Sequence, residues 1–93
     1  MFPFRILAVM NERKPWWFAE QLGGGGFRLT ESSTLGGVAI EPMTSMPSCA
    51  PRADGSRPVV FAFYPTNRRD ITELAVGDDV ELVADRIGDS PVT

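Results

Sequence analysis

Apolar residues in this 93-residue chain gather in short runs that are separated by glycine, proline and charged residues. The longest unbroken apolar run is Val59–Tyr64, which is β-branched and aromatic and lies between Pro58 and Pro65. A run of this length and composition predicts a strand that is buried on both faces. We expect the rest of the chain to cover this strand.

The same pattern predicts three further strands in the first half of the chain. Phe4–Met10 contains a single polar residue and indicates a largely buried strand. Phe27–Glu31 alternates apolar and polar residues, which is typical of a half-buried strand. Thr34–Glu41 is expected to form one strand that Gly36-Gly37 kinks or bulges, as at the corner of a small barrel.

The stretch Leu74–Leu82 places the turn Gly77-Asp78 between alternating apolar residues, a pattern that predicts a β-hairpin. This turn resembles one found in many SH3-like and related small barrels, in which an apolar residue precedes Gly-Asp and a strand follows. The resemblance covers only the residues around the turn. It implies a class of fold and no activity.

The sequence of Pro15–Leu22 is compatible with two secondary structures, a short helix and an extended segment. Pro15 suits the first position of a helix and Gly23 suits its end, so that Trp16, Ala19 and Leu22 would share one face. The strand propensity of Trp-Trp-Phe favours an extended segment instead. We expect a short helix, with the extended segment as the alternative.

Residues 42–58 are expected to form a long irregular loop, because four prolines and the turn signal Asp54-Gly55 fall within them. Residues 86–93 are expected to form a polar tail. We therefore predict a single β-rich domain over residues 1–93, all-β with at most one short helix. Its architecture is either a small SH3-like barrel or a compact β-sandwich with a long proline-rich loop.

The charge is distributed unevenly along the chain. Residues 1–69 carry a balance of +3 and residues 70–93 a balance of −6, for a net charge of −3. The acidic C-terminal quarter favours solubility, or pairing with a basic partner or with another copy of the chain. General binding of nucleic acid is disfavoured, because it usually requires a net basic stripe.

Catalytic signatures are missing from the sequence. The chain has no histidine, which removes the usual base of serine and cysteine hydrolases and the most frequent zinc ligand. Cys49 is the only cysteine, so no intrachain disulfide forms, which fits a reducing compartment. The run Gly23–Gly26 lacks the Gly-Lys-Ser/Thr ending of a phosphate-binding loop. We expect neither an enzyme nor a bound cofactor or metal.

No targeting segment and no run long enough to cross a bilayer is visible in the sequence. We therefore expect a protein that is not secreted through a signal peptide and does not enter a membrane. The predicted location is the cytoplasm or an assembled particle such as a virion.

Three groups of residues are the predicted contacts with a protein partner. Trp16, Trp17 and Phe18 cannot all face one core, so at least one is expected to point outward, and tryptophan is enriched at interface hot spots. Met43 and Met46 would be adaptable contacts. The acidic rim would consist of Asp78, Asp79 and Glu81.

These features predict a non-enzymatic structural or adaptor subunit of a larger protein assembly. A virus-particle component, such as a capsid-cementing or head–tail joining protein, is the most concrete form of this prediction. The first alternative is a small acidic regulatory module that binds and inhibits a basic protein. The second is a nucleic-acid-binding small barrel that uses Arg68, Arg69 and nearby aromatic residues.

Overall fold

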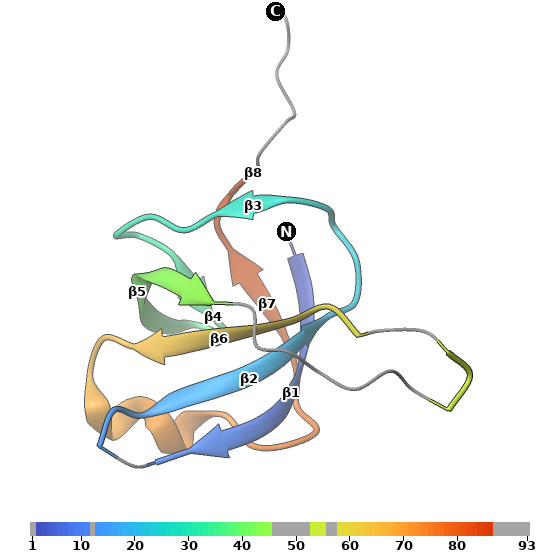
Figure 1. The fold of residues 1–93 in the computed structure, drawn as a ribbon. Helices are drawn as coiled ribbons and strands as arrows, with labels where there is room; N and C mark the ends of the chain where they lie inside the picture. The colour runs from blue at the N-terminus through green and yellow to red at the C-terminus, as the bar shows by residue number, and fades with distance from the viewer. Residues whose placement is uncertain (1, 12, 46–52, 56–57, 87–93) are drawn as a thin grey trace, which may run out of the picture.

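The computed structural model describes residues 2–11, 13–45, 53–55 and 58–86. These residues form eight strands and one 3-10 helix. In chain order they are β1 Phe2–Met10, β2 Trp16–Gln21, β3 Phe27–Arg28, β4 Thr34–Leu35, β5 Val38–Ser45, β6 Val60–Pro65, η1 Arg68–Glu73, β7 Asp79–Val83 and β8 Asp85–Arg86. Six strands close into an antiparallel barrel in the order β1-β2-β6-β5-β4-β7, while β3 and β8 form a separate two-stranded sheet (Figure 1). The predicted small all-β barrel is confirmed, and closure of the sheet excludes the β-sandwich.

The strand β6 has the central position that the apolar run predicts, displaced by one residue from Val59–Tyr64. It pairs with β2 on one side and with β5 on the other. Four of its six residues are buried and the other two, Phe61 and Tyr64, are half-buried. The first strand likewise forms where it is predicted, and begins two residues earlier at Phe2.

Alternation along the strands fills the interior of the barrel. On β1, Phe2, Phe4 and Ile6 are buried, whereas Arg5 and Leu7 are exposed. The buried core cluster draws on six strands and on η1, and it consists of Phe2, Phe4, Ile6, Trp17, Ala19, Leu35, Val38, Ile40, Phe63, Ile71, Leu74 and Leu82. Burial of this apolar surface is the main driving force for closing the barrel.

The helix expected over Pro15–Leu22 is wrong, because Trp16–Gln21 is the strand β2. It pairs with β1 and with β6, so the main-chain groups on both of its sides bond to neighbouring strands. Period-two alternation buries Trp17 and Ala19 and leaves Trp16 and Phe18 on the outside. The extended alternative is the correct one, because both flanking strands stabilise it.

The strand expected over Thr34–Glu41 is instead the hairpin β4–β5. Gly36 and Gly37 form its two-residue turn with φ values of 60° and 85°, a conformation that glycine adopts at no steric cost. Strand β5 then continues to Ser45, so residues 42–45 of the predicted irregular loop belong to a strand instead. Pairing between β5 and β6 is irregular between Ile40 and Thr44, which is where Pro42 lies.

The predicted hairpin around Gly77-Asp78 is also wrong in its first half. The turn is present, but η1 precedes it where the hairpin requires a strand. The carboxylate of Asp78 accepts a hydrogen bond from the main-chain nitrogen of Ala75 at 2.9 Å, and the nitrogen of Gly77 donates to the oxygen of Ile6 at 2.8 Å. The turn therefore leads directly into the pairing of β7 with β1.

The predicted strand Phe27–Glu31 is shorter than expected, since β3 contains only Phe27 and Arg28. The end of the chain beyond Arg86 and residues 46–52 and 56–57 lie outside the described residues. The predictions that involve Met46, Cys49 and most of the polar tail therefore fall outside the structure.

Candidate functional site

The predicted aromatic anchors divide between the inside and the outside of the barrel. Trp17 is fully buried, and its indole Nε1 donates a hydrogen bond to the main-chain oxygen of Ile71 at 3.1 Å. Trp17 is thus a core residue and has no surface for a partner to contact. Trp16 and Phe18, on either side of it, are half-buried on the outside of β2.

The two half-buried aromatic residues on the outside of β2 form a cluster with a third ring, that of Tyr64, which the sequence analysis missed. The ring centroids of Trp16 and Phe18 lie 4.9 Å apart at an interplanar angle of 47°. Those of Trp16 and Tyr64 lie 6.0 Å apart at 28°, a stacked arrangement. Tyr64 follows Phe63, the partner of Trp17 in the pairing of β2 with β6. Only this pairing brings Tyr64 beside Trp16.

Cationic side chains border this cluster at one end of the barrel. A pocket of about 250 Å³ is lined by Arg13, Lys14, Trp16 and Tyr64, and we call it the basic cleft. The ammonium of Lys14 lies 4.9 Å from the centroid of the Tyr64 ring and 3.5 Å from a carboxylate oxygen of Glu41. The cleft therefore joins flat aromatic surface to positive charge.

One of the two predicted nucleic-acid contacts lies next to this cleft. Arg68, at the start of η1, donates from Nη1 to the main-chain oxygen of Arg13 at 2.6 Å. It thereby ties the segment before β2 to η1, and Figure 1 shows η1 at the end of the barrel where β1 ends and β2 begins. Arg69 is exposed on the same helix, where its main-chain nitrogen bonds to the side chain of Asn67.

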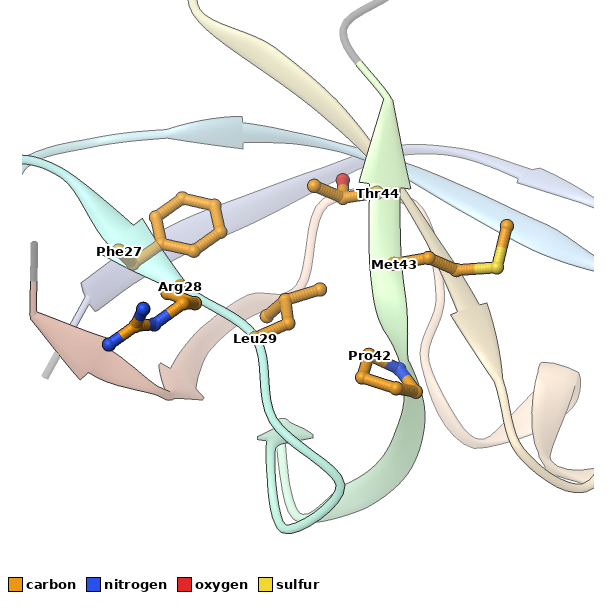
Figure 2. Close-up of a pocket in the computed structure, with 6 residues that line it drawn as sticks. All are labelled: Phe27, Arg28, Leu29, Pro42, Met43 and Thr44. Carbon is orange, nitrogen blue, oxygen red and sulfur yellow. The ribbon is translucent and has the colours of Figure 1, made fainter.

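A second pocket, of about 210 Å³, lies between the β3 segment and β5. Its lining is mostly apolar and comprises Phe27, Arg28, Leu29, Pro42, Met43 and Thr44. Figure 2 shows Phe27, Leu29 and Thr44 directed toward one another across it, while the side chain of Met43 extends from β5 in the other direction. We call this pocket the β3–β5 groove. Met43 is one of the lining residues, and 47% of it is exposed. Met46, the other methionine that we predicted as a contact, lies outside the described residues.

Phe27 connects this groove to the aromatic part of the core. Its ring lies 5.5 Å from that of Phe2, 5.7 Å from that of Phe4 and 4.9 Å from that of Phe61, measured between centroids. These tilted and edge-to-face contacts are the geometries that aromatic rings prefer. The wall of the groove is therefore held in place by the barrel itself.

Two of the three residues of the predicted acidic rim form hydrogen bonds within the molecule. Asp78 holds the 75–78 turn, and Oδ1 of Asp79 accepts a hydrogen bond from Nε of Arg5 at 2.8 Å. This hydrogen bond, aided by the opposite charge, holds the pKa of Asp79 below its usual value, and it also raises the pKa of Arg5. Glu81 is exposed on β7.

Neither a metal cluster nor a membrane span is found in the part of the chain that the structure describes. No group of three or more histidine, cysteine, aspartate or glutamate side chains in it is arranged to hold a metal ion. Within the same residues, no helix has the length and hydrophobicity needed to cross a membrane.

Comparisons with known proteins leave the fold and these two surfaces as the basis for any functional conclusion. No protein family, no curated protein and no solved structure matches the chain. The class that the structure defines is a small, closed, six-stranded antiparallel barrel.

Proposed function

We propose that this protein is a non-enzymatic structural or adaptor subunit of a larger protein assembly, in which the β3–β5 groove receives an extended segment of a neighbouring copy. A virus particle, where many copies of a small subunit meet, is the concrete assembly that we propose. The acidic regulatory module has weaker support, because Asp78 and Asp79 are both engaged within the molecule.

The observation that carries this proposal is the pair of strand edges on the two sides of the groove. Strand β4 pairs with β5 only at Val38 and Ala39. Among the described residues, no strand pairs with that edge of β5 beyond Ala39, and β3 is paired only with β8. Main-chain donors and acceptors on such edges are a template for an added strand.

The side chains in the groove suit an apolar extended segment. Phe27 and Leu29 are half-buried and pack against the core, so that their remaining apolar surface faces the opening. Alternate side chains of an added strand would enter the groove. Pro42 has no main-chain N–H, so the added strand would bond to β5 on either side of it.

Light scattering after size-exclusion chromatography, over a range of protein concentrations, tests the proposal. The wild-type chain should form a defined oligomer. Thr44→Arg should raise the dissociation constant of the oligomer at least about tenfold. The arginine side chain would occupy the groove near Arg28, and docking of the neighbouring segment would bury its guanidinium with no acidic group to pair with it. Thr72→Arg is the matched control, since Thr72 is also an exposed threonine whose hydroxyl bonds to a main-chain oxygen.

Thr72→Arg should leave the oligomer unchanged. A wild-type chain that is monomeric at every concentration would overturn the proposal. Equal weakening by both arginine variants would also count against the groove, because it would point to an effect of added charge at any surface position.

A further inference from the structure

The basic cleft is separate from the β3–β5 groove and shares no lining residue with it. Its flat component is the stacked pair of Trp16 and Tyr64, whose rings are held by neighbouring strands β2 and β6. Phe18 supports Trp16 from the same strand at 4.9 Å between centroids. Both rings of the stacked pair are only half-buried, so apolar ring surface remains open to solvent.

The cationic side chains of the cleft lie next to this aromatic surface. Arg13 and Lys14 line the pocket directly, and Arg68 holds the main chain of Arg13 through its hydrogen bond. Glu41 is the carboxylate that contacts Lys14. Arg13, Lys14 and Arg68 thus bring positive charge to this place, although the whole chain has a net charge of −3.

We propose that the basic cleft binds single-stranded nucleic acid, with a base stacking on Trp16 beside Tyr64 and with Arg13 and Lys14 contacting phosphate groups. Arg68 is a positioning residue for Arg13. This inference goes beyond the proposed function, and it would survive the failure of the groove as a site of self-association.

Two physical arguments favour this ligand over an apolar peptide. Aromatic rings flanked by cations are the combination that single strands require, since every base has a flat face and every linkage a negative charge. An apolar segment would partly desolvate Arg13 and Lys14 and would bring no negative charge to them, which costs free energy. An unpaired strand also exposes its bases for stacking, whereas a duplex keeps them inside.

Fluorescence anisotropy with a fluorescein-labelled oligothymidylate of about 12 nucleotides tests the proposal, at roughly 20 mM salt and at increasing salt. The wild-type chain should bind, with an affinity that falls as salt rises. Trp16→Ala should weaken binding about 5- to 150-fold, the range expected for loss of one stacked base. Trp16→Phe, which keeps a ring, should retain most of the affinity.

The salt dependence of oligonucleotide binding tests the role of the cationic side chains. Lys14→Gln should reduce the slope of log affinity against log salt by about one, the value for loss of a phosphate contact. Arg28→Gln removes an exposed cation from the other pocket and should leave the slope unchanged. A labelled polyglutamate peptide of similar length should bind more weakly than the oligonucleotide.

Three results would overturn the proposal. The first is no binding of the oligonucleotide by the wild-type chain at low salt. The second is binding that neither Trp16→Ala nor Lys14→Gln changes. The third is equal or tighter binding of polyglutamate that Trp16→Ala leaves unaffected, which would make the cleft a nonspecific cationic surface or a site for acidic protein segments. Circular dichroism of each variant checks that the barrel is intact.

Discussion

The indole nitrogen of Trp17 donates a hydrogen bond to the main-chain oxygen of Ile71, with 3.1 Å between the two atoms. This bond joins β2 to η1 inside the barrel, where both residues are buried. It gives a buried carbonyl group its partner and fixes the orientation of the largest side chain in the core. Since Trp17 pairs with Val9 and Phe63 across the neighbouring strands, the same residue links three strands to the helix.

Trp17→Phe should therefore lower the free energy of unfolding by roughly 2–4 kcal/mol, from the cavity and from the carbonyl oxygen of Ile71 that loses its donor. Urea unfolding followed by far-UV circular dichroism measures it. Trp16→Phe, on the outside of the same strand, should cost well below about 1 kcal/mol. Equal losses for the two variants would contradict the division of these tryptophans between core and surface.

The two glycines of the β4–β5 turn should differ in their response to alanine. A Cβ atom at Gly36 would lie 2.9 Å from Cδ2 of Leu74 and 3.0 Å from Cγ1 of Val80, whereas a Cβ at Gly37 would meet nothing within 4 Å. Both alanines carry the strain of a positive φ, about 1–2 kcal/mol. Gly36→Ala should cost a further 1–3 kcal/mol, roughly, because packed side chains must move.

Thermal or urea unfolding of the two glycine variants gives this comparison directly, with Gly37→Ala as the internal control for backbone strain. Identical losses at the two positions would show that Leu74 and Val80 move aside freely.

The exposed pair of Arg5 and Asp79 should make stability depend on pH in the acid range. The pKa of Asp79 is lower in the folded chain than in the unfolded one, chiefly through the hydrogen bond from Arg5. The contribution of the pair is therefore complete above the ordinary pKa of an aspartate, about 3.9, and is lost as the pH falls through the folded value. The melting temperature of Asp79→Asn should lie below that of the wild type at neutral pH.

The two melting temperatures should converge when the pH is lowered through the acid range, and added salt should also reduce the difference, because the pair is exposed. Glu81→Gln, an exposed position on the same strand, is the control. Glu20 lies beside Arg5 on the other neighbouring strand and contributes to the raised pKa of Arg5, so the effect of losing Asp79 alone is expected to be modest. A difference that grows as the pH falls would contradict the assignment.

Much of the fold follows from local pattern. The continuous apolar run predicts the central strand β6, and the near-absence of polar residues predicts β1. The positive-φ requirement of a Gly-Gly turn can be recognised locally, but whether it kinks one strand or joins two cannot. The helix predicted over Pro15–Leu22 fails for a related reason, because Pro15 and Gly23 end a strand as readily as they bound a helix.

The candidate sites depend more heavily on pairs that are distant in the sequence. The sequence indicates that at least one of Trp16, Trp17 and Phe18 points outward, but it does not single out Trp16, and the stacking partner Tyr64 belongs to the central apolar run. Lys14 reaches the same ring from the segment before β2, and Arg68 joins from η1. No periodicity within one segment encodes these contacts, because each joins segments that are distant in the sequence.

The sequence by itself determined the class of the fold, the central strand and the lack of a histidine-based catalytic site. These properties depend on composition and on short-range alternation, which act within a few residues. Only the tertiary structure decided that Trp17 is core while Trp16 is surface, that β5 continues through Met43, and that cations meet aromatic rings at one end of the barrel. Closure of a barrel is a cooperative pairing of strands from the whole chain, so which face is buried is settled only when every strand has its neighbours.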